Sequence, residues 1–229
     1  MFFETRRVGD IAIVRIRGRI VEGPESISLQ RHLDDLMPFG PHILLHLADV
    51  DFVDSSGLGL LVRYLTRTRN ARGSLKLCAL SAKADEVLRL TRLRSIFDAY
   101  ETESDAIEAF YRRPDAAGAH ARLQPDILCV APSADVQVYV REVLGQAGYG
   151  VLTAGNLPDA LILLQATRPK LVIVASALRA TRDTHTAEKF NRLVDATNVV
   201  ELPSTFSTYD AGEAGERLLH QVRAAMRPM

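Results

Sequence analysis

The feature that most limits how this chain can fold is a break near its middle. Residues 112–125 show no apolar periodicity and carry Pro114 and Pro125 near their two ends. Such a composition is typical of a linker between domains. Each side of the break is long enough for a domain of ordinary size. We therefore predict two domains, at residues 1–112 and 126–229, joined by a linker at residues 113–125.

In the first half, short apolar runs alternate with segments of helical periodicity. Residues 57–70 place apolar side chains on one helical face, namely Leu58, Leu61, Val62 and Leu65. Strands are predicted at residues 11–16, 43–47 and 75–79. Further helices are predicted from Gly23 onward, around residues 84–90, and from a cap near Ser104. This alternation predicts an α/β domain in which helices pack on a sheet.

The second half alternates more regularly. Strands are predicted at residues 127–130, 149–153, 171–174 and 199–202. Helices are predicted after a cap at Ser133 or Asp135, after Asn156, over residues 187–196 and over residues 212–226. The run at 171–174 is apolar throughout, as central parallel strands are. The pattern predicts a doubly wound parallel sheet of four strands.

The most informative stretch is Asp54-Ser55-Ser56-Gly57-Leu58-Gly59, which follows a predicted strand and precedes a predicted helix. Ser56 is then exposed at a helix N-terminus, where unpaired backbone N–H groups and the positive end of the helix dipole stabilise a phosphate. A phosphate would add about two negative charges beside Asp54 and Asp51. Two glycines, Gly57 and Gly59, would let another protein approach the hydroxyl closely. Phosphorylation of Ser56 would therefore repel an acidic partner.

The same residues have a plainer interpretation. Asp54 or Ser55 could simply cap the helix, with the glycines allowing tight packing. The residues alone leave the cap and the switch equally open. A catalytic serine is excluded, because a nucleophile elbow needs glycine two residues before and two after the serine. Ser56 has Asp54 and Leu58 at those positions, and we expect no enzymatic activity.

The segment from Leu47 to Gly59 closely resembles the signature of the STAS domain in anti-anti-sigma factors, also called anti-sigma factor antagonists. The resemblance continues through residues 75–81 and 90–97 and covers nearly all of residues 1–111. It implies an α/β fold with helices packed on a single sheet. It also implies that Ser56 is the phosphorylation site. We take the partner-binding residues to be Asp54, Ser55, Ser56, Gly57, Leu58 and Gly59.

The resemblance also implies partners. In that family the serine is phosphorylated by a serine kinase that is itself the anti-sigma factor. The unphosphorylated form captures this kinase and frees the sigma factor, and a PP2C-type phosphatase reverses the modification. The chain is accordingly expected to bind an anti-sigma factor serine kinase when Ser56 is unphosphorylated and to release it when Ser56 is phosphorylated.

The second half resembles the flavodoxin-like receiver domains of response regulators at residues 127–136, 146–154 and 168–174. A working receiver holds Mg²⁺ on an acidic pair after its first strand and accepts phosphate on an aspartate after its third. Here the acidic-pair positions are Ala131 and Pro132, and the acceptor position is Ala175, followed by Ser176. Neither alanine nor proline can bind the cation or accept the phosphoryl group. We interpret residues 126–229 as a shortened pseudo-receiver that serves docking or dimerisation.

Composition and charge limit which partners, location and cysteine chemistry can be expected for the protein. The 28 basic and 28 acidic residues balance, which predicts no direct binding to nucleic acid or an anionic membrane. No apolar stretch approaches the ~20 residues of a membrane span, so we expect a soluble cytoplasmic protein. Cys78 and Cys129 lie in apolar runs and are expected to be reduced core thiols rather than a redox pair.

Weaker patterns leave alternatives open. His42 and His46 bracket a predicted strand without a third nearby ligand, so no metal or other cofactor is predicted. Four arginines follow the serine junction, residues 54–59, and give its helix a basic side: Arg63, Arg67, Arg69 and Arg72. This side is either a solvated face or a contact with an acidic surface of the kinase. The alternative function is a non-catalytic scaffold, in which both domains assemble a signalling complex or a homodimer.

Overall fold

The computed structural model describes residues 1–111, 125–180, 185–206 and 211–226. The chain divides into two compact units, Met1–Phe110 and Tyr111–Met229. The predicted linker at 113–125 falls almost wholly outside the described residues, so its bounds stay a prediction.

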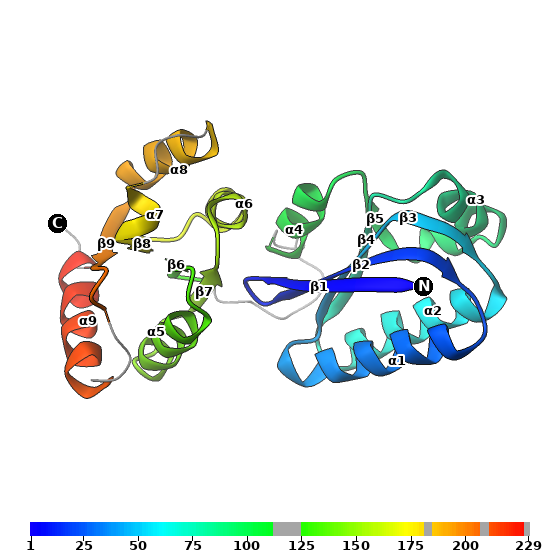
Figure 1. The fold of residues 1–229 in the computed structure, drawn as a ribbon, viewed down its shortest axis with the longest axis horizontal. Coiled ribbons are helices and arrows are strands. Elements are labelled where there is room, and N and C mark those ends of the chain that lie inside the picture. The colour runs from blue at the N-terminus through cyan, green and yellow to red at the C-terminus, as the bar shows by residue number, and fades with distance from the viewer. Residues whose placement is uncertain (112–124, 181–184, 207–210, 227–229) are drawn as a thin grey trace. The chain divides into compact units, whose positions relative to one another are not determined.

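The first unit is built on one five-stranded sheet in the order β1-β2-β3-β4-β5, with helices packed on it (Figure 1). Its strands are β1 (Phe2–Val8), β2 (Ile11–Ile20), β3 (His42–Val53), β4 (Ser74–Cys78) and β5 (Asp98–Tyr100). β1 runs antiparallel to β2, and the other neighbours are parallel. The helices are α1 (Pro24–Leu36), α2 (Ser55–Asn70), α3 (Ala82–Leu90) and α4 (Glu103–Tyr111), with short 3₁₀ turns at η1 (Met37–Phe39) and η2 (Leu93–Ser95). The predicted α/β class is confirmed for this unit.

The two faces of this sheet are covered differently. Leu29 of α1, Leu61 of α2 and Leu88 of α3 share one buried core with alternate residues of β2, β3 and β4. Each such buried leucine stabilises the fold by roughly 1.5–3 kcal/mol relative to exposure. On the opposite face, Phe110 of α4 packs edge-on against His42 of β3, with ring centroids 5.9 Å apart. Figure 1 shows α1 and α2 on one side of the sheet and α4 on the other.

Several features of this unit differ from the predictions. β2 continues to Ile20, beyond the predicted end at residue 16. β1 and β5 were not predicted, because β1 is mostly exposed with three charged residues among its seven and β5 has three residues, too few to show a period. β3 continues to Val53, beyond the predicted end at residue 47. The cap of α4 is Thr102 rather than Ser104, since the Thr102 hydroxyl accepts a hydrogen bond from the Asp105 N–H at 3.1 Å.

The second unit contains a four-stranded parallel sheet in the order β7-β6-β8-β9. Its strands are β6 (Ile127–Val130), β7 (Val151–Ala154), β8 (Leu171–Ala175) and β9 (Asn198–Leu202). Its helices are α5 (Ala134–Gln146), α6 (Leu157–Thr167), α7 (Ser176–Arg179), α8 (His185–Asp195) and α9 (Ala211–Ala225). The predicted parallel sheet is therefore present, with α7 as an element that the sequence did not suggest.

Local chemistry in this unit follows the sequence closely. Ser133, rather than Asp135, caps α5, because its hydroxyl accepts from the Val136 N–H. Asn156 caps α6 in the same way, with proline in the first turn. Every residue of β6 is buried, which explains its continuous apolar run.

Candidate functional site

The serine junction lies where β3 ends and α2 begins. The last half of β3 does not alternate, because Leu47, Val50 and Val53 face the core and the residues between them are exposed. Two register shifts against β2 account for this three-residue spacing. Such bulges re-aim side chains at the end of a strand. Here they carry the chain past the end of the sheet and deliver Asp54 at the start of α2.

Asp54 is the N-cap of α2 and fixes the junction. Its Oδ1 accepts a hydrogen bond from the Gly57 N–H at 2.7 Å, and its Oδ2 accepts from the Glu22 N–H at 2.9 Å. The Asp54 N–H donates to the carbonyl of Ile20 at 3.1 Å. The hydrogen bonds from the Gly57 and Glu22 N–H groups hold the pKa of the Asp54 carboxyl below its usual value. The carboxylate therefore stays ionised and ties α2 to the end of β2.

Ser55 and Ser56 occupy the first turn of α2, and both are exposed. Because Asp54 supplies the cap, neither serine is needed to close the helix end. Of the two capping residues that the sequence left open, Asp54 has that role and Ser55 does not. Ser56 thus presents its hydroxyl at the positive end of a helix of 16 residues.

The two glycines of the junction have different surroundings. A Cβ on Gly57 would lie 2.3 Å from the carbonyl oxygen of Ile20, so this position is closed to any side chain. A Cβ on Gly59 would meet nothing within 4 Å, and the residue is exposed. Gly57 is therefore explained by packing within the unit. Gly59 has no such reason, although glycine in a helix interior costs about 1 kcal/mol relative to alanine.

The four arginines that follow the junction do not form one basic surface. Arg63 donates to Gln30 at 3.2 Å and Arg67 pairs with Asp34, so both are directed to α1. Arg69 instead donates to the carbonyl of Ile96, near η2. Arg72 lies beyond the end of α2 with a positive φ. The structure thus separates residues that the sequence placed on one basic side.

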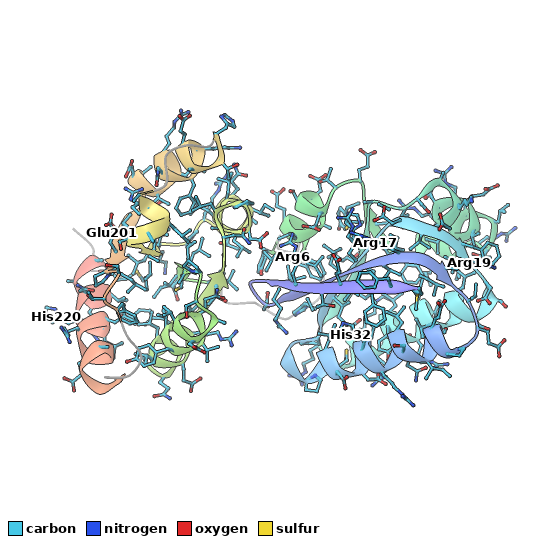
Figure 2. The ribbon with its side chains drawn as sticks, in the orientation of Figure 1. Arg6, Arg17, Arg19, His32, Glu201 and His220 are labelled. Atoms are coloured by element: carbon cyan, nitrogen blue, oxygen red, sulfur yellow. The ribbon has the colours of Figure 1, made fainter. Side chains whose placement is uncertain are left out.

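A second set of basic residues, which the sequence analysis missed, lies on β2. Arg15, Arg17 and Arg19 alternate with buried residues and are exposed on the sheet face opposite to α1 and α2. Figure 2 shows Arg17 and Arg19 on the side of the sheet away from His32 of α1. Arg19 lies over the ring of Phe52, 5.2 Å from its centroid. The alternation in residues 14–20 is the sequence signal that could have revealed this set.

In the second unit, the positions that the receiver resemblance compares with carboxylates are the small apolar residues Ala131, Pro132 and Ala175. Ala131, directly after β6, is 1% exposed, and its carbonyl accepts from the Gln137 side chain at 2.7 Å. Ala175 ends β8 and precedes α7 without a side-chain cap. Ser176 is the first residue of this four-residue helix.

Arg179, the last residue of α7, pairs with two carboxylates of neighbouring elements. Its guanidinium pairs with Asp195 of α8 and with Glu201 of β9, the latter at 3.3 Å, and donates to Asn191 at 2.9 Å. These bonds join α7, α8 and β9. The same residues line a hollow of about 880 Å³ that contains charges of both signs. Among the described residues, the hollow has no two neighbouring carboxylates free of such bonds.

The histidines and cysteines lie apart from the serine junction. His46 lies half-buried in β3, where burial lowers its pKa, and its Nδ1 has no hydrogen-bond partner among the described residues. Cys78 and Cys129 are buried free thiols of different units, and burial raises the pKa of each to about 12. Within the described part of the chain, no three His, Cys, Asp or Glu side chains gather as metal ligands.

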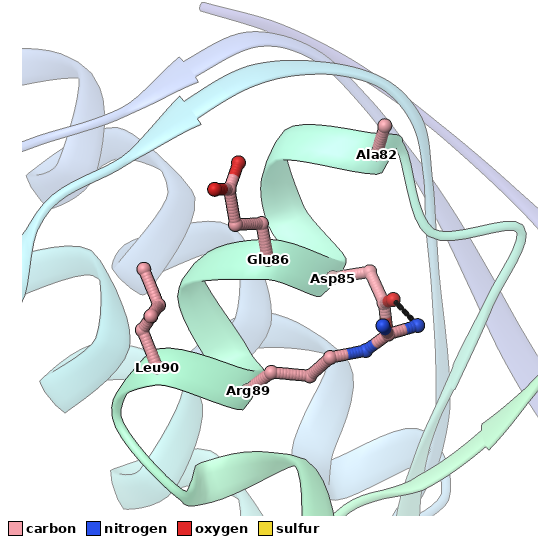
Figure 3. Close-up of a pocket in the computed structure, with 5 residues that line it drawn as sticks. All are labelled: Ala82, Asp85, Glu86, Arg89 and Leu90. Atoms are coloured by element: carbon pink, nitrogen blue, oxygen red, sulfur yellow. Dashed lines mark ion pairs between the residues drawn. The ribbon is translucent and has the colours of Figure 1, made fainter.

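The remaining surface features are modest. A hollow of about 390 Å³ beside α3 is lined by Ala82, Asp85, Glu86, Arg89 and Leu90. Figure 3 shows that these side chains come from one helix and that Arg89 and Asp85 pair with each other. A hollow lined by one helix has no converging polar groups to orient a ligand. Among the described residues, no helix is long and apolar enough to cross a membrane.

Comparison with known proteins places the first unit in a family. Residues 2–106 match the family model of the STAS domain. The match to the STAS domain therefore covers nearly the whole of the first unit. The resemblance of the second unit to receivers stays a prediction.

Named relatives align with part of this STAS domain. A candidate anti-sigma factor antagonist of Thermotoga maritima is 37% identical over 71 residues, which are 31% of this chain and 63% of that protein. A homologue in Thermotoga neapolitana is 36% identical over 66 residues, 29% of this chain and 58% of that protein. The chain thus spans about three fifths of the length of these relatives. A crystal structure of the Thermotoga maritima antagonist covers 48% of this chain and 95% of its own, with 28% identity and a TM-score of 0.42.

Proposed function

We propose that the chain is an anti-anti-sigma-type regulator. Its STAS domain binds an anti-sigma factor serine kinase when Ser56 is unphosphorylated and releases the kinase when Ser56 carries a phosphate. A PP2C-type phosphatase restores the binding form. The chain performs no catalysis itself and acts in the cytoplasm.

The proposal rests on one observation at the start of α2, namely that Asp54 caps the helix while Ser56 is left exposed. Asp54 holds both the cap of α2 and the end of β2, so Ser56 is exposed and available for modification. The first turn of a long helix favours a phosphate, because its N–H groups and dipole point at the anion. The family match and the two relatives described as candidate anti-sigma factor antagonists support the choice of partner.

Release follows from local charge. Asp51 is exposed and the Asp54 carboxylate is ionised, so a phosphate on Ser56 gathers a third negative group at one helix end. An acidic partner surface is then repelled, and a close approach over Gly59 is obstructed. The effect needs no rearrangement of the fold.

For the second unit we propose a receiver-like domain without phosphoryl chemistry. The strand order β7-β6-β8-β9 supports this, because it matches the first four strands of a flavodoxin-like doubly wound sheet. Ala131, Pro132 and Ala175 supply no ligand for Mg²⁺ and no acceptor. The domain then serves as a docking or dimerisation surface.

The proposal is tested by binding of the full chain to an anti-sigma factor serine kinase from the same cell, measured by calorimetry. The Ser56→Ala chain should bind as tightly as the unmodified chain, and Ser56→Asp should weaken binding tenfold or more. Ser104→Asp is the matched control, because it adds the same charge at an exposed serine in the first turn of α4, outside the proposed binding residues.

Equal affinity of the Ser56→Ala and Ser56→Asp chains would overturn the proposal. Light scattering distinguishes the scaffold alternative. A large homo-oligomer that binds no kinase would support a structural subunit instead.

A further inference from the structure

One face of the STAS sheet is only partly covered by helices. α4 packs over the part of this face where His42 of β3 and Lys76 of β4 approach the ring of Phe110. Farther along β2, every second residue is an arginine whose exposed side chain lies on this face. We call Arg15, Arg17 and Arg19 the arginine ladder.

Ion pairs hold the side chains of Arg15 and Arg17 in place but do not cancel the positive charge of the ladder. Asp49 accepts a hydrogen bond from Arg15 at 3.2 Å and forms an ion pair with Arg17 at 3.6 Å, so one carboxylate is shared by two guanidinium groups. Glu4 approaches Arg17 only to 3.9 Å. All of these side chains are about half exposed, and pairs of this kind contribute little to stability. The ladder is therefore not explained by the stability of the fold.

Arg19 differs from the other two arginines. Among the described residues it has no ion pair, and its guanidinium lies over the exposed ring of Phe52. Phe52 is 43% exposed, although large apolar side chains are normally buried. Exposed arginine and aromatic side chains held in place by each other are the groups that dominate protein interfaces.

The Arg19–Phe52 pair adjoins the serine junction. Phe52 is two residues before Asp54, and the charge of Arg19 reaches the Asp54 carboxyl and helps to keep it ionised. A partner that covers Ser56 from the side of β2 therefore meets Arg19 and Phe52 first and the rest of the ladder next. This places the ladder beside the phosphorylation site and away from the arginines of α2.

The chemistry of this face favours protein carboxylates over nucleic acid. Glu4 and Asp49 lie among the arginines, and they would repel a continuous phosphate backbone. Separate carboxylates on a folded partner can instead face the arginines singly. Electrostatic complementarity of this kind mainly sets the association rate and the choice of partner.

We propose that the kinase-binding surface extends from Ser56 onto the arginine ladder and Phe52, where it receives an acidic surface of the partner. This inference rests on the proposed function and specifies the charge and position of the partner surface. The phosphate on Ser56 then acts twice, since it repels the partner carboxylates and offers Arg19 a counter-charge within its own chain.

The test has two arms, both with the full chain at low salt. In the first, an acetylated hexaglutamate peptide is titrated into ¹⁵N-labelled protein, with hexaglutamine as the neutral peptide. Chemical-shift changes should concentrate at residues 15–19 and 52. They should disappear in Arg17→Glu/Arg19→Glu and in the milder Arg17→Gln/Arg19→Gln chain. Arg31→Glu/Arg63→Glu is the matched control, because it removes two exposed arginines of α1 and α2 with the same change in net charge.

In the second arm, Arg17→Gln/Arg19→Gln should lower affinity for the kinase about tenfold, since exposed pairs contribute modestly and two are lost. Phe52→Ala should lower it further, while Arg31→Gln/Arg89→Gln, which removes two exposed arginines outside the ladder with the same change in net charge, should leave it unchanged. Unchanged kinase binding by the Arg17→Gln/Arg19→Gln chain would overturn this inference, even if Ser56→Asp abolishes binding and so supports the proposed function.

The two proposals can also fail in the opposite way. If the kinase binds no form of the chain, the proposed function fails and the peptide arm still decides whether the ladder accepts carboxylates. Shift changes spread over all arginines, or a larger response at the ladder to a deoxythymidine decamer than to hexaglutamate, would overturn the inference.

Discussion

Each unit contains a serine where a parallel strand leads into a helix, and the two junctions differ in chemistry. β3 leads into α2 through Asp54 and Ser56, and β8 leads into α7 through Ala175 and Ser176. The first helix has 16 residues and a side-chain cap. The second has four residues and no side-chain cap.

The two junctions therefore differ in how well each would stabilise a phosphate on its serine. A helix end attracts an anion through unpaired N–H groups and aligned peptide dipoles. The long helix α2 offers both, and Asp54 leaves Ser56 exposed. In α7 the last residue, Arg179, is instead committed to Asp195 and Glu201, which fixes the short helix in the fold.

The largest expected difference between the two junctions is in the incorporation of phosphate. With the anti-sigma factor kinase and ATP, Ser56→Ala should abolish incorporation and Ser176→Ala should leave it unchanged, as measured by intact mass and fragment spectra. With Mg²⁺ and acetyl phosphate, the chain should remain unmodified at Ala175 and Ser176. An acid-labile phosphate in the second unit would remove the distinction between the junctions.

Packing at the first junction gives the next largest effect. Gly57→Ala should destabilise the STAS domain by about 2 kcal/mol, because its Cβ would overlap the Ile20 carbonyl. Gly59→Ala should stabilise it by roughly 0.5–1 kcal/mol while weakening kinase binding. Hydrogen exchange of the slowest amides in β2 and β3 measures the stability of this unit alone. If Gly59→Ala binds the kinase normally, close approach at this position is not required.

Removal of the cap should have a smaller effect. Asp54→Ala should cost about 1 kcal/mol, because the Gly57 and Glu22 N–H groups lose their acceptor. Ser176→Ala should change stability by less than about 0.5 kcal/mol, as most exposed substitutions do. The same exchange measurement, applied to each unit, compares the two. Equal losses would mean that Asp54 is no more important to its helix than Ser176 is.

The smallest effect is a pH dependence confined to the first junction. The Gly57 and Glu22 N–H groups keep the pKa of Asp54 below 3.8, so the folded state binds this proton less readily than the unfolded chain. The contribution is complete above that pH and is lost as pH falls through the folded pKa. The stability difference between the natural chain and Asp54→Asn should therefore narrow from about pH 5 to about pH 3. A constant difference would show that the charge of Asp54 is not involved.

Most elements of the fold could be predicted because their residues carry strong local signals. The cap at Asn156, the apolar runs of β6 and β8 and the helical spacing of α2 each reflect one element and its own burial. β3 was predicted too short for an equally physical reason. Its two bulges replace a period of two by a spacing of three, which no longer reads as a strand.

By itself, the sequence determined the alternating α/β pattern, the STAS resemblance and the choice of Ser56, since these depend on residue order and local chemistry. Only the tertiary structure decided which residue caps α2, why Gly57 is closed and Gly59 open, and where the basic surface lies. Those properties depend on contacts that β2 makes with β3 and α2, from which α1 separates it in the sequence. The arginines of α2 are directed to different neighbours, whereas those of β2 share one open face because a strand turns every second side chain the same way.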